Sequence, residues 1–236
     1  MRAPAIIPAA GVGHRMKSSV RKQFLTLLDR PLLDYSIEAV DSCKMIEKVI
    51  LVVCEDDLAF CRDRYLKKRR LSTPVEILPG GKDRQESVYL GLRHLQSLDE
   101  APQWIVIHDG ARPLVTNKII KEVLKAAYKS MAAIAAVPVS DTMKIVKEDK
   151  LWTDKTLDRE KVWAAQTPQA FSFPLLLEAH KQAEKNGFKG TDDASLLERL
   201  GHSVCIVEGE DENIKITRPV DLKLAELILS SRKGAL

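Results

Sequence analysis

Short apolar runs alternate along the chain with segments in which apolar residues return every three or four positions. The runs predict strands over Ala5–Pro8, Lys48–Cys54, Val75–Leu78, Trp104–His108, Ala132–Val139 and Val204–Val207. The periodic segments predict helices, with buried stripes at Val88, Leu92 and Leu95 and at Ile119, Val123 and Leu124. Alternating strands and helices are typical of βαβ units. We therefore expect an α/β fold, a three-layer α/β/α sandwich with a mostly parallel sheet.

The last third of the chain predicts three helices with recognisable ends. A helix over Pro174–Asn186 is expected to end at Gly187, and a shorter one over Asp192–Leu200 to end before Gly201. Pro219 suits the first turn of a C-terminal helix. The apolar stripe of that helix is expected at Val220, Leu224, Leu227 and Ile228.

The alternation of strands and helices stops at about residues 140–160. The range Asp141–Arg159 is charged and has no long helical pattern, although Met143–Val146 is strand-like. We interpret this range as a β-arm that protrudes from the sheet. Leu151 and Trp152 near its middle would be costly to expose to water, and a dimer partner could cover them. The alternative is a hairpin folded back on its own domain.

Length and composition favour one globular domain. A chain of 236 residues is long enough to bury on the order of 70% of its unfolded surface in one core. The hydrophobic share of 45% and the charged share of 30% are ordinary for such a domain. The net charge of +4 is the balance of 37 basic and 33 acidic residues spread along the chain, so a nucleic-acid partner is not expected.

The cysteines and the apolar runs favour a cytoplasmic protein without a membrane span. No CxxC pair and no zinc-ligand spacing occurs among Cys43, Cys54, Cys61 and Cys205, so reduced, buried thiols are expected. The longest apolar runs fall far short of the ~18 residues that suggest a membrane span. No signal peptide is expected, because a strand and its loop follow the first residues directly.

The segment Ile6–Phe24 begins as an apolar strand and continues as a glycine-containing, cationic loop. Gly11 and Gly13 allow bare backbone to approach a ligand at the carboxyl end of the strand, where open parallel sheets bind their ligands. Neither common phosphate motif is present, because Met16 replaces the third glycine of GxGxxG and no GxxxxGK[ST] pattern occurs. The loop carries four cationic side chains, those of Arg15, Lys17, Arg21 and Lys22. They favour a polyanionic ligand, although a solvated basic loop would have the same composition.

Several motifs carry a resemblance to a known family. The first strand's loop, Pro8–Met16 followed by Lys22–Phe24, resembles the signature loop of sugar-nucleotide pyrophosphorylases and related nucleotidyltransferases. Later segments resemble the 2-C-methyl-D-erythritol 4-phosphate cytidylyltransferases of the non-mevalonate isoprenoid route: His108–Pro113, Asp141–Lys144, Gln166–Phe171, and Thr191–Ser195 with Asn213–Pro219. The match runs in order over nearly the whole chain. It implies one nucleotidyltransferase domain over residues 1–236, with a Rossmann-like sheet and a dimerisation arm at about 140–160.

The resemblance implies a nucleotidyl transfer from CTP. A phosphate oxygen of 2-C-methyl-D-erythritol 4-phosphate attacks the α-phosphorus of CTP in line, pyrophosphate leaves, and 4-diphosphocytidyl-2-C-methyl-D-erythritol forms. This reaction needs no protein nucleophile, but it needs two polyanions held together and the charge of the leaving group stabilised. Mg2+ is the implied cofactor, held mainly by the CTP phosphates, with Asp109 as a further candidate ligand.

The resemblance also implies roles for individual residues. Arg15 and Lys22 are expected to neutralise the triphosphate in the transition state. Arg159 and Lys215 are expected to orient the attacking phosphate, and Arg159, at the end of the arm, could complete the site of a neighbouring subunit. The expected CTP contacts are Ala9, Ala10, Gly11, Gly13, Gly80, Gly81, Ser87 and Asp109. The expected contacts of the second substrate are Asp109, Arg112, Thr142, Arg159, Thr167, Thr191 and Lys215.

Three residues next to these motifs are interpreted separately. Arg112 either binds substrate or pairs with Asp109, and substrate binding is the favoured interpretation. His108 is expected to be a packed residue at a strand end rather than an acid or a base. Lys82 stands where members of the family often have an acidic residue near the ribose, so no contact to the sugar is assigned to its side chain.

Two alternative functions remain beside this interpretation. Ribitol 5-phosphate cytidylyltransferases have the same fold and similar Asp-Gly, Asp-Thr and Thr-Pro-Gln segments, but Thr191–Ser195 and Asn213–Pro219 favour methylerythritol phosphate. A non-catalytic nucleotide-binding protein of this fold would bind CTP without releasing pyrophosphate. The joint presence of Arg15, Lys22, Asp109, Arg159 and Lys215 argues against that alternative.

Overall fold

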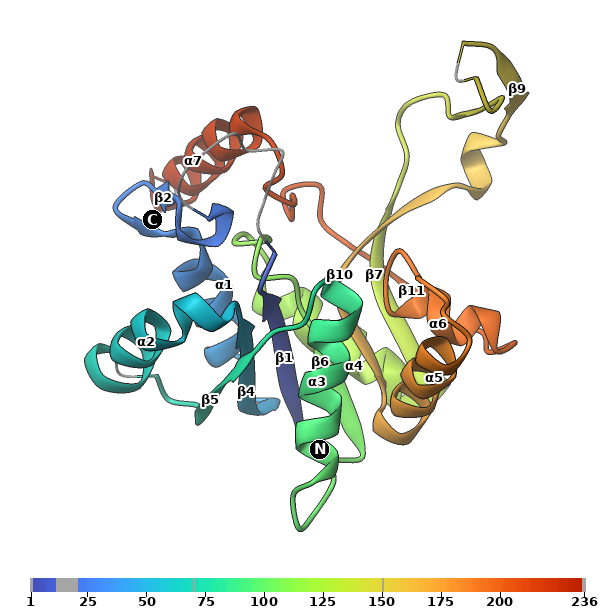
Figure 1. The fold of residues 1–236 in the computed structure, drawn as a ribbon. Helices are drawn as coiled ribbons and strands as arrows, with labels where there is room; N and C mark the ends of the chain where they lie inside the picture. The colour runs from blue at the N-terminus through green and yellow to red at the C-terminus, as the bar shows by residue number, and fades with distance from the viewer. Residues whose placement is uncertain (1, 12–20, 70, 150, 235–236) are drawn as a thin grey trace.

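A computed structural model describes residues 2–11, 21–69, 71–149 and 151–234 of the chain. Within these residues the main sheet has seven strands, in the order β11-β7-β10-β6-β1-β4-β5 (Figure 1). The strands are β1 Ala3–Ala9, β4 Ile46–Val53, β5 Val75–Pro79, β6 Trp104–Ile107, β7 Ala132–Pro138, β10 Trp163–Ser172 and β11 Cys205–Glu208. The predicted strands therefore form, with ends shifted by only a few residues.

Most neighbouring strands in the main sheet are parallel, as expected. β1 pairs with β4 and β6, β4 with β5, and β7 with β11, all in parallel. β10 runs antiparallel between β6 and β7. This strand was not predicted, because Gln166–Phe171 is recognisable in the sequence only as a motif.

The polar middle of β10 explains why its pattern is not strand-like. Its side chains at Gln166, Thr167 and Gln169 are buried, although all three are polar. The pairing register with β7 also shifts between Ala165 and Gln169, around Pro168, which cannot donate a ladder hydrogen bond. Neither an apolar run nor a clean alternation results, so hydrophobic periodicity gives no signal.

Helices cover both faces of the sheet, so the three-layer α/β/α architecture is confirmed. The helices are α1 Leu32–Asp41, α2 Leu58–Cys61, α3 Arg84–Gln96, α4 Asn117–Ser130, α5 Phe173–Lys185, α6 Ala194–Arg199 and α7 Pro219–Gly234, with short helical segments η2 Lys22–Phe24, η3 Glu55–Asp57, η4 Arg62–Lys68 and η5 Arg159–Lys161. One apolar cluster packs α1 and α4 on one face, and a second packs α3, α5 and α6 on the other. The predicted stripes of α3 and α4 are buried in these clusters.

The ends of α5 and α6 are where the glycines predict them. Gly187 and Gly201 adopt positive φ values of 62° and 85°, a backbone conformation that glycine adopts at little cost. The predicted range of the second helix, Asp192–Leu200, is too long at both ends, because α6 begins at Ala194 and ends at Arg199.

The prediction for the apolar stripe of α7 is wrong for most of its members. Val220, Leu224 and Leu227 are 64%, 45% and 65% exposed. The helix instead packs through Ala225, which is fully buried, and its neighbours on the same face join a small cluster with Leu27. Apolar residues occur on nearly every side of this helix, so their spacing alone does not identify the buried face.

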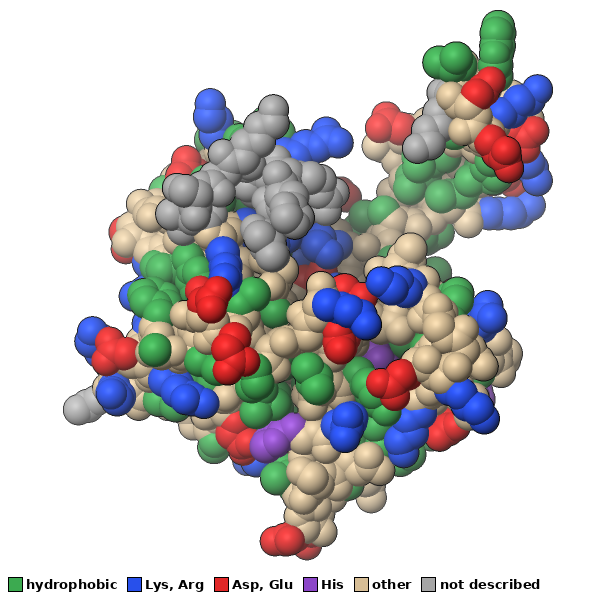
Figure 2. Space-filling view, viewed as in Figure 1, with side chains coloured by type: hydrophobic (Ala, Val, Ile, Leu, Met, Phe, Trp, Pro, Cys, Tyr) green, Lys and Arg blue, Asp and Glu red, His purple; other side chains and the backbone are tan. Residues whose placement is uncertain are grey.

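The range predicted as an arm forms a hairpin that stands clear of the body. Its strands are β8 Lys144–Val146 and β9 Thr153–Thr156, which pair antiparallel in a sheet of their own. Leu151 and Trp152 lie between them and are 81% and 67% exposed. Figures 1 and 2 show the hairpin extending from the main sheet, with apolar side chains at its outer end. The hairpin thus does not fold back on its own domain. The described residues of the chain leave the side chains of Leu151 and Trp152 largely exposed.

The expectation of buried, reduced cysteines is met in part. All four cysteines lie in described regions and are free thiols. Cys43 and Cys61 are buried as expected, whereas Cys54 and Cys205 are only half-buried. Among the helices of the described ranges, none has the length and apolar character needed to cross a membrane.

Candidate functional site

Two adjoining cavities lie at the carboxyl ends of the central strands. We call the first the β1 cavity: it has a volume of about 150 Å3 and is lined by residues that include Ala9, Ala10, Gly11, Lys22 and Ser87. We call the second the β10 cavity: it has a volume of about 210 Å3 and is lined by residues that include Arg112, Gln166, Thr167, Thr191 and Asp192. Both cavities are also bordered by Arg84, Asp109 and Lys215, which we call the shared wall.

A close backbone approach lies next to the β1 cavity, although Gly80 and Gly81 themselves do not line it. Gly80, just after β5, donates its backbone N–H to the carbonyl of Val53 over 2.7 Å. A Cβ atom at Gly80 would lie 2.3 Å from the Cβ of Ala10, so a larger residue does not fit there. Ser87 accepts a hydrogen bond from the backbone of Gly81 at 3.2 Å. The predicted glycines and Ser87 are therefore brought next to the loop that follows β1.

Asp109 is the centre of the shared wall. Its carboxylate receives Arg84 Nε at 2.7 Å on Oδ1 and Lys215 Nζ at 2.6 Å on Oδ2. Burial opposes ionisation, since the residue is only 5% exposed, but the charges of Arg84 and Lys215 outweigh it and hold the pKa of the carboxyl well below its usual range. Asp109 is thus an anion with both oxygens already paired.

Thr167 fixes the loop that carries Asp109. The backbone N–H of Asp109 donates to Thr167 Oγ1 at 3.0 Å, and the same oxygen lies 3.1 Å from His108 Nδ1. Burial lowers the pKa of His108 to about 4, so its ring is neutral at pH 7. Nε2 lies 3.1 Å from the carbonyl of Arg112 and must carry the proton, so Thr167 donates to Nδ1. His108 is packed at a strand end and holds its neighbours, as expected.

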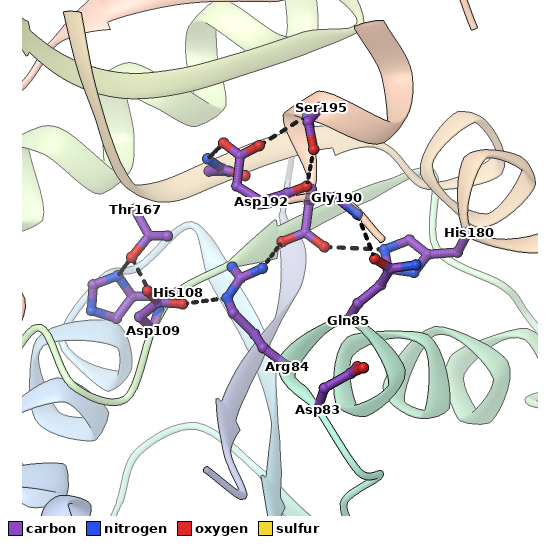
Figure 3. A network of polar contacts seen from close by, with 12 residues as sticks. Asp83, Arg84, Gln85, His108, Asp109, Thr167, His180, Gly190, Asp192 and Ser195 are labelled. Carbon is purple, nitrogen blue, oxygen red and sulfur yellow. Dashed lines mark hydrogen bonds and ion pairs between the residues drawn. The ribbon is translucent and has the colours of Figure 1, made fainter. Parts of the chain in front are cut away.

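Arg84 connects the shared wall to a second buried carboxylate (Figure 3). Its Nη1 lies 2.7 Å from Asp193 Oδ2, and His180 Nε2 lies 3.0 Å from the other oxygen of Asp193. Burial of Asp193 is outweighed by the charge of Arg84 and the hydrogen bond to His180, so the pKa of its carboxyl is lowered. Neither Arg84 nor Asp193 was predicted to have a role; the signals in the sequence are the position of Arg84 shortly after Gly80 and Gly81 and that of Asp193 in a matched motif.

Arg112 does not pair with Asp109 in the described contacts. Its Nη1 donates to the carbonyl of Asn213 at 2.6 Å, and its Nη2 donates to the carbonyl of Ala165 at 3.3 Å. Asn213 in turn donates from its side chain to the carbonyl of Thr167 at 2.9 Å. These bonds join three matched motifs, and they hold the segment that leads to Lys215.

The cations of the first loop differ in their surroundings. Lys22 lines the β1 cavity, as its expected role requires. Arg21 instead pairs with Asp56 at 2.7 Å and with Asp57 at 2.6 Å, so it is not directed at a ligand. Three further residues of this loop lie outside the described residues: Arg15 and Gly13, which are expected to contact CTP, and Lys17, which is one of the cations of the loop.

Two of the expected substrate contacts lie on the arm. Thr142 and Arg159 are exposed, and Arg159 donates to the carbonyl of Ser140 at 3.1 Å. As far as the described ranges extend, neither residue lines the two cavities, whereas Thr191 lines the β10 cavity. Lys82 lines a different hollow, between α3 and α5. A single chain therefore does not bring every expected contact to the site.

The shared wall fits a metal ion only if a ligand brings the metal with it. Among the described residues there is no group of three or more His, Cys, Asp or Glu side chains that could hold a metal ion. Asp109 already has a cation on each oxygen. It could offer an oxygen to a phosphate-bound divalent cation once Lys215 turns away. The chain by itself does not supply a complete metal site in this region.

Comparisons with known proteins agree with one another. The family model described as IspD, 2-C-methyl-D-erythritol 4-phosphate cytidylyltransferase, matches residues 3–231. A protein of that name from Caldanaerobacter subterraneus subsp. tengcongensis is 45% identical over 97% of this chain and 99% of its own, and one from Syntrophus aciditrophicus is 46% identical over 98% and 97%.

Solved structures of similarly named enzymes have the same fold. The 4-diphosphocytidyl-2C-methyl-D-erythritol synthase from Anaerococcus prevotii superposes with a TM-score of 0.84, at 31% identity and coverage of 97% of this chain and 96% of that one. The 2-C-methyl-D-erythritol 4-phosphate cytidylyltransferase from Thermus thermophilus superposes with a TM-score of 0.77, at 32% identity and coverage of 97% and 98%.

Proposed function

The chain belongs to the 2-C-methyl-D-erythritol 4-phosphate cytidylyltransferase family, and on that premise we propose that the β1 cavity binds CTP and the β10 cavity binds 2-C-methyl-D-erythritol 4-phosphate. The enzyme is a nucleotidyltransferase of isoprenoid biosynthesis. The observation that carries the assignment of the cavities is the shared wall. Because Arg84, Asp109 and Lys215 border both cavities, ligands in the two cavities would meet at these side chains.

The reaction joins two polyanions, and the chain supports it with fixed positive charge. A phosphate oxygen of methylerythritol phosphate forms a bond to the α-phosphorus of CTP while the bond to the bridging oxygen breaks and pyrophosphate leaves. Lys22 in the β1 cavity, with Arg15, neutralises the triphosphate and the charge that grows on the leaving group. Lys215 on the shared wall orients the attacking phosphate.

The two ligands are held by different kinds of contact. The cytidine is proposed to lie against the backbone of Ala9, Ala10 and Gly11 and beside Ser87. Gly80 is packed directly behind Ala10, where a larger residue would push Ala10 into the cavity. Methylerythritol phosphate is proposed to lie against residues of the β10 cavity, with polar contacts from Arg112, Thr167, Thr191 and Lys215. The hydroxyl hydrogen of Thr167 is already donated to His108, so this residue serves mainly through the position it gives Asp109.

Mg2+ is the proposed cofactor, carried on the CTP phosphates. When bound, it would offset negative charge on the phosphate oxygens, and Asp109 is the residue of the shared wall that could contribute an oxygen to it. We also propose a cytoplasmic location, since free, partly buried thiols suit a reducing compartment.

The arm supports a homodimer as the working unit. Leu151 and Trp152 at its tip are uncovered in one chain, and a second copy would bury them. Arg159 and Thr142 line neither cavity among the described residues of their own chain, and we propose that they complete the β10 cavity of the partner.

Pyrophosphate release from CTP tests the proposed function. The purified protein with Mg2+ is expected to release pyrophosphate with 2-C-methyl-D-erythritol 4-phosphate and to do so poorly with ribitol 5-phosphate. A preference for ribitol 5-phosphate would instead identify the related cytidylyltransferase. Saturable binding of CTP without release in the presence of either acceptor would identify a non-catalytic nucleotide-binding protein.

A further inference from the structure

Asp109 is paired with two cations that differ in how they are held. Lys215 reaches it through a single ammonium group on a side chain that is 36% exposed. Arg84 reaches it with Nε while its Nη1 is bound to Asp193. Lys215 has one charged partner among the described ion pairs, whereas Arg84 is fixed at two points. Of the two cations, Lys215 is the one free to exchange partners.

The far end of this chain of contacts is buried. Asp193 and His180 are each 1% exposed, and His180 stacks on Tyr89 with ring centroids 5.8 Å apart. Arg84 itself leads α3, a helix that packs on the sheet through fully buried leucines. Figure 3 shows Arg84 lying between Asp109 on one side and the His180 side of the network on the other. The guanidinium is therefore held in place independently of any ligand.

The proposed reaction asks Lys215 to bind the attacking phosphate, which means leaving Asp109. Asp109 would then keep Arg84 as its partner among the described ion pairs of the shared wall. Burying a carboxylate that has lost a partner is costly, so the side chain is drawn towards solvent unless it is held. Arg84, which is itself fixed to Asp193, is the group that holds it.

We propose that Arg84 is a positioning residue for the transfer: anchored through Asp193 to His180, it keeps the Asp109 carboxylate in place while Lys215 moves from Asp109 to the substrate phosphate. The inference rests on the proposed function, which supplies the phosphate. A planar guanidinium presents donors in a fork that spans two carboxylates, whereas a lysine ammonium is a point charge and cannot bridge both. Charge alone is therefore not sufficient at this position.

Three variants separate this role from a structural one. Arg84→Met removes the bridge, Arg84→Lys keeps the charge without the fork, and Asp193→Asn keeps the shape of the anchor without its charge. The matched control is Arg93→Met, which removes an exposed arginine from the opposite side of the same helix, with its guanidinium 6.0 Å from the centre of the Tyr89 ring. Turnover number and KM for each substrate are measured with Mg2+, together with thermal unfolding.

The turnover number of Arg84→Met and of Arg84→Lys is expected to fall by about 10- to 100-fold, with KM for CTP changed much less, as for residues that orient a reacting group. The turnover number of Asp193→Asn is expected to fall as well, but by a smaller factor. In a further variant, Arg84→Ala, which leaves space for a small cation, guanidinium ion at millimolar concentration is expected to restore part of the turnover, which a purely structural loss would not allow.

Several results would overturn the proposal. A turnover number for Arg84→Met or Arg84→Lys equal to that of Arg93→Met would remove the role, and a rise in KM for CTP alone would make Arg84 a simple nucleotide contact. If Arg84→Met does not fold, Asp193→Asn decides, because an unchanged turnover number there excludes the anchor. A wild-type protein that releases no pyrophosphate would contradict the proposed function itself, a different outcome from these.

Discussion

At the scale of the residue, neighbouring cations in the first loop have different environments. Lys22 faces the β1 cavity, while Arg21 is held by two carboxylates, one of them on Asp57. A guanidinium fixed in this way is not available to a triphosphate. The number of cations in the loop thus overstates the number that can act on a ligand.

Lys22→Ala is expected to lower the turnover number by on the order of a hundredfold, because removing one preorganised donor to developing charge costs about 3 kcal/mol of activation free energy. Pyrophosphate release at saturating CTP and acceptor measures this effect. Arg21→Ala is the matched control and is expected to stay within a few-fold of wild type. A near-normal turnover number for Lys22→Ala would remove Lys22 from the chemistry.

Gly80→Ala is expected to weaken CTP binding and to destabilise the fold by about 1–3 kcal/mol, since the new methyl group meets the Cβ of Ala10 at 2.3 Å and one of the two must move. KM for CTP and urea unfolding measure the two effects. Adding Ala10→Gly removes the methyl group that is struck and should recover part of the lost stability. No recovery in the double variant would show that the clash is relieved elsewhere.

Single-residue roles are predictable only where a local pattern marks them. Asp109 follows an apolar strand, and ligands of parallel sheets gather at that end, so it could be predicted. Arg84 could not, because its partners Asp109 and Asp193 are 25 and 109 positions away along the chain. The pairing of Asp109 with Lys215 is also set by tertiary structure, so matching the motifs identified both residues but not their contact.

At the scale of the element, α3 shows how a cap positions site residues. Asp83 at the start of the helix accepts a hydrogen bond from the backbone N–H of Glu86 at 2.9 Å. Arg84 and Ser87 lie in the first turn that this bond orders. The stability of the cap and the geometry of the cavities are therefore linked.

Asp83→Ala is expected to lower the free energy of unfolding by ~1 kcal/mol, and Asp83→Ser to keep most of it, because serine can also accept from the helix backbone. Urea unfolding at pH 7 measures both. The hydrogen bond from Glu86 lowers the pKa of Asp83 in the folded state. The stabilisation by the ionised Asp83 carboxylate is therefore complete above its pKa in the unfolded chain, about 3.9. It is lost as the pH falls through the lower pKa of the folded state. If the wild-type protein at pH 2 still exceeded Asp83→Ala in free energy of unfolding by as much as at pH 7, this account would be contradicted.

The elements differ in how well their sequences mark them. Strands β1 and β4 are buried on both faces and read as apolar runs, so their positions were predictable. β10 was not, because its middle carries the polar side chains of the site and bends around Pro168. α7 was located correctly but oriented wrongly, since only contacts with the cluster around Leu27 select its buried face.

The tip of the arm should control association of the chain. Replacing Leu151 and Trp152 together by serine removes the most exposed apolar side chains of the arm and is expected to shift the protein from dimer to monomer. Sedimentation velocity over a range of concentrations measures the shift. A wild-type protein that is monomeric throughout would remove the basis of the proposed dimer.

At the scale of the whole molecule, the arm separates two expected site residues from the cavities of their own chain. If the partner chain supplies Arg159, then Lys22→Ala and Arg159→Ala should each lose most of the activity alone but complement each other. Mixed dimers contain one site with both changes and one with neither. After subunit exchange at equal amounts, about a quarter of the wild-type activity is expected.

The recovery of activity in this mixture depends only on which chain supplies Arg159. Each parent protein, incubated alone under the same conditions, is the control. Absence of any recovery in a mixture shown to contain mixed dimers would mean that Arg159 acts within its own chain or not at all.

The shared wall also links the affinities of the two substrates. One ammonium and one guanidinium face both cavities, so anions bound on either side draw on the same positive charge. Each occupant then reduces the attraction left for the other, and by thermodynamic linkage the two dissociation constants change by the same factor. Under the proposed assignment of the cavities, the product would span both of them. It is therefore expected to compete with either substrate for the same side chains.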